Sequence, residues 1–173
     1  MRVATGLIAA FALAFGGLAA AQTWVEYRPA GAGFRIEMPG KPQVNNQDVN
    51  TDVGPVPSTT AVVEVGTSVA YVVMHSNYPD KVLAARTPEQ VLNGVRDGAA
   101  KGKVLRSEEQ LTVGGYPARR LVIDDHKQGF VFLSQVVLAG TQLNQAIFVS
   151  QTKGAENSSD AKRFIDSFAI VDR

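Results

Sequence analysis

One stretch of the sequence decides the fold: residues 130–139, which read Phe-Val-Phe-Leu-Ser-Gln-Val-Val-Leu-Ala. It carries no charge, and its apolar residues fall at both odd and even positions. Because alternate residues of a strand point to opposite faces, both faces of this predicted strand must be covered. Residues 69–74, Val-Ala-Tyr-Val-Val-Met, have the same continuous apolar character. We therefore expect a sheet whose central strands are buried on both faces.

The segments around residues 130–139 predict an antiparallel meander. Short turns separate the predicted strands, and consecutive strands joined by short turns pair with one another. The Gly114-Gly115 pair is a two-residue hairpin signal. The strands expected in this block cover residues 104–113, 116–124, 130–139 and 143–151.

The N-terminal half also predicts strands, although its polar part leaves two interpretations open. Residues 34–38, Phe-Arg-Ile-Glu-Met, alternate apolar and charged side chains, which is typical of a half-buried strand. Residues 43–52 are either an edge strand or a loop, and the prolines of residues 54–57 predict a turn. Further strands are expected at residues 23–28, 59–65 and 69–74.

Two segments have helical spacing. Thr87, Pro88 and Gln90 form a capping-box pattern at the start of the first helix. Its apolar face comprises Val91, Leu92, Val95 and Ala99, and Gly102 is the expected C-cap. The spacing of Gly94 and Gly98 predicts a close contact between helix and sheet. The second helix is expected to begin at Ser158 or Ser159 and to bury Phe164, Ile165 and Phe168.

These elements predict an α+β fold in which an antiparallel sheet has helical or other cover on each face, an α/β/α sandwich. Residues 22–173 are long enough to form one domain with its own core, and no linker divides them.

The first 21 residues have the layout of a secretory signal peptide. Arg2 supplies a positive charge, Leu7 to Phe15 form an apolar core, and Ala19 to Ala21 provide small residues. Cleavage is expected between Ala21 and Gln22, and the alternative is an uncleaved membrane anchor. Cleavage predicts a periplasmic or secreted protein with no stable membrane anchor.

Composition excludes several kinds of chemistry. The chain has no cysteine, which excludes disulfides, thiol catalysis and acylation of a lipoprotein cysteine. It has 17 basic and 16 acidic residues, so it lacks the concentrated positive charge that nucleic-acid binding requires.

The histidines are the main candidates for catalysis or metal binding. His126 follows Asp124 and Asp125 beside the predicted turn at residues 128–129, where solvated polar side chains are the favoured interpretation over a metal or acid–base site. His75 continues an apolar strand, which favours a half-buried structural histidine. We predict no catalytic residue, no metal ligand and no cofactor.

Two pairs of adjacent charged residues lie on predicted strands. Adjacent strand residues face opposite ways, so Glu108 and Glu109 cannot form one carboxylate site. By the same rule Arg119 and Arg120 face opposite sides of the sheet. One of the arginines is therefore expected to be partly buried and paired with an acidic residue. As to their role, edge-strand charges that prevent aggregation are favoured over a ligand anchor.

The start, middle and end of the chain resemble the PsbP-like superfamily. The similar segments are residues 34–42, Phe-Arg-Ile-Glu-Met-Pro-Gly-Lys-Pro, the hairpin at residues 113–118, and residues 164–168, Phe-Ile-Asp-Ser-Phe. This superfamily includes the PsbP subunit of photosystem II, the Ran-binding Mog proteins and bacterial DcrB-like periplasmic proteins. The resemblance covers about residues 24–172 and implies the α/β/α fold. It transfers no functional residue, because one fold hosts many functions.

Three functions are compatible with these features. The leading hypothesis is an exported, non-enzymatic accessory or protein-interaction module with a protein partner in the cell envelope. The second is a carrier of a small molecule or lipid, held between helix and sheet. The third is a hydrolase-type enzyme that uses His75 or His126 with an aspartate. The sequence specifies neither the binding residues nor the oligomeric state.

Overall fold

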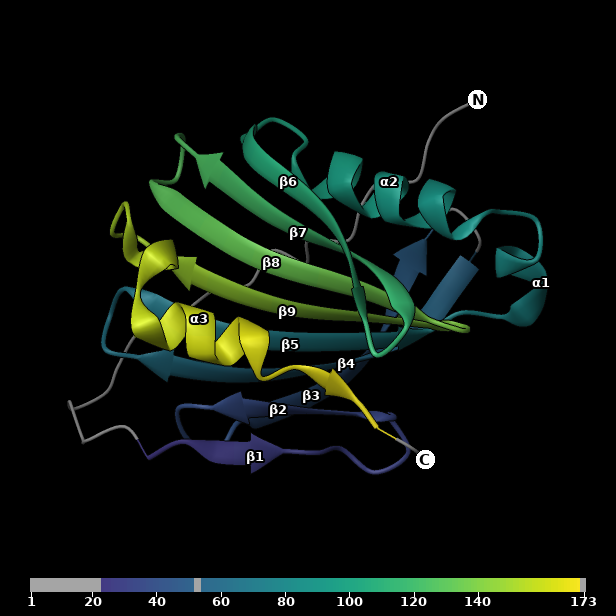
Figure 1. Cartoon of the computed structure of the whole chain (residues 1–173), viewed down its shortest axis with the longest axis horizontal. Coiled ribbons are helices and arrows are strands. Elements are labelled where there is room, and N and C mark those ends of the chain that lie inside the picture. The colour runs from purple at the N-terminus through teal and green to yellow at the C-terminus, as the bar shows by residue number, and fades with distance from the viewer. Residues whose placement is uncertain (1–22, 52–53, 172–173) are drawn as a thin grey trace.

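A large antiparallel sheet dominates the computed structural model, which describes residues 23–51 and 54–171 (Figure 1). Within this part of the chain the sheet has seven strands in the order β3-β4-β5-β9-β8-β7-β6. The antiparallel meander predicted for residues 104–151 is therefore confirmed. Strands β5, β9 and β8 are the central strands of the whole sheet. The strand bounds are β3 Gln43–Thr51, β4 Gly54–Val65, β5 Val69–Asn77, β6 Val104–Val113, β7 Tyr116–Asp125, β8 Phe130–Ala139 and β9 Gln142–Ser150.

The Gly114-Gly115 turn between β6 and β7 forms as predicted. Both glycines have positive φ, +57° and +83°, which is the backbone that a two-residue hairpin with the right-handed strand twist requires. A side chain on Gly114 would also bring its Cβ to 3.1 Å from the Cβ of Ile170. The hairpin therefore depends on glycine for both its conformation and its packing.

A smaller sheet forms next to the large one. It has the order β1-β2-β10 and comprises β1 (Val25–Tyr27), β2 (Phe34–Met38) and β10 (Ala169–Ile170). Phe34 pairs with Ile170 from the other end of the chain, so this sheet joins the first and last described strands. The α+β class is confirmed, but the α/β/α sandwich is not a full description, because strands share one of the outer layers.

Helices lie on both faces of the large sheet. On β8, Leu133 and Val137 face the layer formed by α3 (Ser159–Asp166) and β2, whereas Val136 and Leu138 face α2 (Pro88–Ala99). Figure 1 shows α3 in front of the large sheet, with β1 and β2 beside it. The first layer buries the larger core, whose fully buried side chains include Phe34, Ile36, Met38, Phe148, Phe164 and Ile165.

The predicted capping box of α2 is present. The Gln90 N–H donates to Thr87 Oγ1, and the Thr87 N–H donates to Gln90 Oε1. The predicted C-cap is wrong, because α2 ends at Ala99 with Ala100 as cap, and Gly102 lies in the following turn. Two short helices, α1 (Asp80–Leu83) and the 3₁₀ turn η1 (Ala155–Asn157), were not predicted, since they are too short to show a period.

Residues 54–57 form the start of β4, not the predicted turn. Pro55 and Pro57 pair with Asn50 and Asp48 of β3. On its other side, β4 pairs with β5 only from Ser58 onward. The prolines therefore occupy a part of β4 that has one neighbour, where a missing N–H is tolerated. Of the two alternatives for this segment, an edge strand or a loop, the structure has the edge strand, at residues 43–51.

Gly94 does not mark a close helix-to-sheet contact. A Cβ built on it meets no heavy atom within 4 Å, and its position is half-buried. Gly94 therefore destabilises the helix relative to alanine, and no closer packing at this position compensates for it.

We predict that Gly94→Ala raises the free energy of unfolding by about 1 kcal/mol, because alanine restricts the unfolded chain and favours helix. Urea unfolding of residues 22–173, followed by the fluorescence of Trp24, the single tryptophan, measures this. A lower stability would show that the space beside Gly94 is needed.

Candidate functional site

The Asp124-Asp125-His126 cluster lines an open hollow of about 190 Å³ at the turn between β7 and β8. Asp125 is buried, and its Oδ1 accepts the N–H groups of Lys127 and Gln128, both at 3.1 Å. His126 is exposed. The remaining lining residues are Gly129, Phe130, Val131, Gln151 and Lys153. Asp125 therefore closes the turn and is buried, not solvated as predicted, whereas His126 is solvated as predicted.

Asp124 belongs to a second cluster on the α3 side of the sheet. Arg106 Nη2 lies 3.4 Å from Asp124 Oδ1 and 2.5 Å from Glu156 Oε1. Glu156 is only 4% exposed, and its Oε1 also accepts from Asn157 Nδ2 at 3.3 Å. The burial of Glu156 could not be predicted, since nothing in its local sequence distinguishes it from a solvated loop residue. Among the described residues, no three His, Asp or Glu side chains are placed to hold a metal ion.

His75 lies far from His126 along the strands. It pairs with Asn144 of β9, whereas the turn that holds His126 adjoins Val131, which pairs with Ser150, six residues further along β9. The His75 ring contacts Phe34, with 5.7 Å between centroids. Burial lowers the pKa of His75. The two histidines therefore cannot act in one site, and no carboxylate of the described part of the chain is paired with His75.

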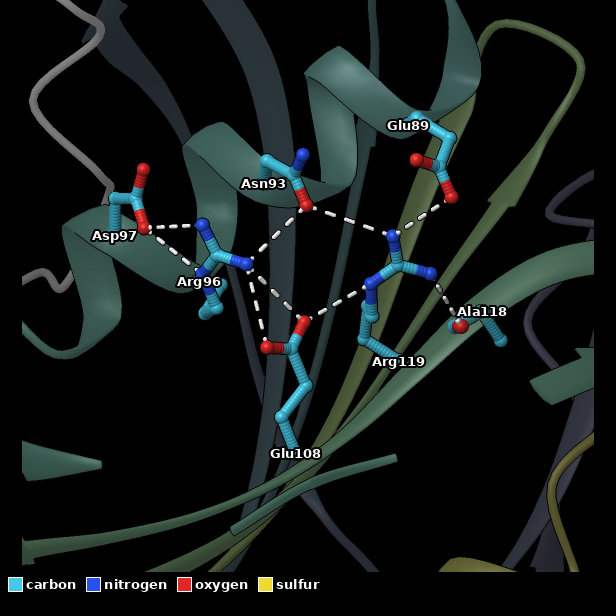
Figure 2. A network of polar contacts seen from close by, with 7 residues as sticks. All are labelled: Glu89, Asn93, Arg96, Asp97, Glu108, Ala118 and Arg119. Carbon is cyan, nitrogen blue, oxygen red and sulfur yellow. Dashed lines mark hydrogen bonds and ion pairs between the residues drawn. The ribbon is translucent and has the colours of Figure 1, made fainter. Parts of the chain in front are cut away.

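The most extensive polar network ties α2 to β6 and β7 (Figure 2). At its centre is Arg119, which is 3% exposed. Its Nε lies 3.0 Å from Glu108 Oε1, and its Nη2 donates to Glu89 Oε1 at 3.1 Å. Weaker contacts reach Asn93 Oδ1 and the Ala118 carbonyl. The interpretation of a buried, paired arginine is confirmed.

Arg96 continues the network along the helix. Its Nη1 donates to Glu108 Oε2 at 3.2 Å and to Asn93 Oδ1 at 3.4 Å, and its Nη2 lies 2.7 Å from Asp97. Hydrogen bonds to Asp97, and then to Glu108, raise the pKa of Arg96. Glu108 thus bridges two guanidinium groups, one from the helix and one from the sheet, as Figure 2 shows.

Arg120 attaches α3 to the opposite face of the sheet, as Arg119 attaches α2. Its Nη2 donates to Asp166 Oδ1 at 2.8 Å and to Gln135 Oε1 at 2.7 Å, while Gln135 Nε2 donates to the Ile165 carbonyl. The alternative of edge-strand charges is wrong, because β7 lies between β8 and β6. The two adjacent arginines therefore attach one helix to each face.

We predict that Arg119→Met lowers the free energy of unfolding by about 3 kcal/mol, because Glu108 and Glu89 lose a buried partner. The matched control is Arg35→Met, which breaks an exposed pair with Glu26 and is expected to cost under about 1 kcal/mol. Urea unfolding of both variants measures the difference. An equal loss of unfolding free energy in the two variants would show that burial does not strengthen the Arg119 network.

The fold resembles a solved structure. The solution structure of cyanobacterial PsbP (CyanoP) from Synechocystis sp. PCC 6803 superposes with a TM-score of 0.56 at 16% identity, over 90% of this chain and 96% of that one. A protein of unknown function from Pseudomonas aeruginosa, PA94, described as a putative regulator, gives 0.48 at 12% identity, over 87% and 97% of the chains. The PsbP-like fold that the sequence motifs implied is therefore confirmed.

No protein-family model matches the sequence, and no curated protein matches it either. Within residues 23–51 and 54–171, no helix is long and apolar enough to cross a membrane. The predicted signal peptide of residues 1–21 and the predicted cleavage site between Ala21 and Gln22 lie outside the described residues.

Proposed function

We propose that this protein is an exported, non-enzymatic accessory module that binds a protein partner at β3, one edge of the large sheet. The observation that carries the proposal is that β3 lacks the features that normally block an edge strand. An open edge presents unpaired N–H and C=O groups, to which an extended segment of another protein can add as a further strand.

The sequence of β3 leaves this edge open. Its nine residues contain one charged side chain, Asp48, and no proline. It pairs with β4 over its whole length without a register shift, and no other described strand pairs with it. Val44 is 51% exposed, which offers an apolar contact beside the backbone groups. At about 3.3 Å per residue, the strand presents an edge roughly 30 Å long.

The opposite edge, β6, is protected. It carries Arg106, Glu108 and Glu109, and its pairing register shifts between Leu105 and Ser107. Charges and bulges are the usual devices against edge-to-edge pairing. Arg106 and Glu108 also tie this strand to η1 and α2. The contrast between the two edges of one sheet favours β3 as the binding edge.

The other two hypotheses receive less support. A carrier needs space between helix and sheet, but Tyr71, Phe148 and Phe164 pack edge to face between α3 and the large sheet, with centroids 5.2–5.3 Å apart. An enzyme needs a nucleophile or base in contact with an orienting group. Neither His75 nor His126 has such a partner among the described residues.

The proposal predicts that a photo-crosslinking amino acid at Asn45 of β3 captures a protein partner in cells that export the protein. The same amino acid at Ser107 of β6 is the matched control and is expected to capture none. Adducts of equal yield at both edges, or at neither, would contradict the proposal. An adduct of twice the chain's mass would identify a second copy and would contradict an accessory role.

A pair of edge substitutions tests the same surface. Gln43→Lys/Val44→Lys adds one charge to each face of β3 and leaves Asn45 free for the crosslinker, whereas Ser107→Lys/Thr112→Lys does so on β6. We expect only the β3 variant to lose the captured partner, because charged edge residues oppose strand addition. Both variants are expected to keep their unfolding free energy within about 0.5 kcal/mol, since these side chains are exposed.

A further inference from the structure

His75 occupies the junction between the two sheets. Its ring lies against Phe34 of β2, which is fully buried and stacks on Phe168 with 5.3 Å between centroids. Phe34 also pairs with Ile170 of β10. The imidazole, which belongs to β5 of the large sheet, therefore contacts an aromatic pair from the layer of the small sheet.

Within residues 23–51 and 54–171, no ion pair or hydrogen bond from a charged side chain reaches this imidazole. In the register of the large sheet, His75 lies between Thr59 of β4 and Asn144 of β9, and both are neutral. Asn144 is completely buried, and neither atom of its amide has a hydrogen-bond partner. The strands β5, β8, β9 and β10 contain no Asp, Glu, Lys or Arg.

The charged residues of the neighbouring elements point elsewhere. On β2, Arg35 bonds to Glu26, and Glu37 bonds to Arg163 of α3. Arg35 and Glu37 alternate with Phe34 and Ile36 along the strand, so they lie on the opposite face of β2. On α3, Asp166 bonds to Arg120, and Asp160 acts on Tyr71, which lies four residues before His75 on β5. On β4, Glu64 is exposed and pairs with Ala70, well away from the register position of His75. A proton on His75 would thus place an uncompensated cation beside the Phe34 contact.

We propose that His75 is an acid trigger, whose protonation loosens the small β1-β2-β10 sheet from the large sheet. This response to pH does not depend on partner binding at β3. It would act in a compartment whose pH follows the surrounding medium, which is where an exported protein is expected to work.

The direction of the effect follows from linkage. Burial lowers the pKa of His75 in the folded protein below the ordinary value of 6.5, so the unfolded chain binds the proton more tightly. The full stability is present above pH 6.5 and is lost as the pH falls below it. At most one proton is involved, which sets a limit of about tenfold in the unfolding equilibrium constant per pH unit. Hydrogen bonding to Arg163 lowers the pKa of Glu37 below 4.5, so that pair acts outside this window.

The test is urea unfolding of residues 22–173 between pH 7.5 and 5.5, in wild type, His75→Gln and His126→Gln. Trp24 is a suitable reporter, because its ring contacts Tyr71 of the large sheet with 5.9 Å between centroids. We expect the unfolding constant of wild type and His126→Gln to rise several-fold below pH 6.5, and that of His75→Gln to stay flat. The same rise in all three proteins would overturn the proposal.

Two measurements on wild type keep the proposal testable if His75→Gln does not fold. An NMR titration of the His75 ring must give a pKa below 6.5, and a value at or above 6.5 would overturn the trigger. Amide exchange at pH 5.5 must accelerate in β2 and β10 relative to β8, after correction for intrinsic rates. Uniform acceleration would show a global loss of stability and no loosening of the small sheet.

Discussion

The central strands β8 and β9 bury side chains on both faces, and the rest of the architecture follows from the need to cover them. Alternate residues of β8 enter different cores: Leu133 and Val137 enter the one under α3 and β2, and Val136 and Leu138 enter the one under α2. Neither helix alone covers a seven-stranded sheet. The small sheet completes the layer on the α3 side, which explains why the first and last described strands of the chain meet there.

Adjacent arginines on β7 use the same alternation for a different purpose. Arg119 and Arg120 point to opposite faces, and each bonds to residues of the helix on its side. Burial of Arg119 is costly, and the carboxylates of Glu108 and Glu89 offset that cost. Directional bonds between the sheet and Glu89, Asn93 and Arg96 add to the apolar packing and set one position for α2.

The likeness to cyanobacterial PsbP concerns the fold, and at 16% identity it says nothing about residues on the surface. Function must therefore be argued from features of this chain. The unprotected edge at β3 and the isolated imidazole at the sheet junction are such features, and both depart from what stability alone favours. Stability favours a blocked edge and either a paired or an apolar residue in place of His75.

The sequence by itself determined the elements whose signals are local. The ends of the strands at residues 34–38, 104–113 and 130–139, the diglycine hairpin and the capping box at Thr87 all follow from neighbours within a few positions. Tertiary structure decided the rest, because the deciding contacts join residues far apart in the chain. Arg106 bonds to Glu156 across 50 positions, β2 pairs with β10, and Phe34 lies on His75. Even Pro55 and Pro57 lie in a strand only because β5 pairs with β4 from Ser58 onward, which leaves β3 as the one described strand that pairs at these prolines. A local sequence pattern does not specify which side of a strand has a neighbour, because strand order depends on contacts between distant segments. Strand order determined both the conformation of this segment and the edge proposed for binding.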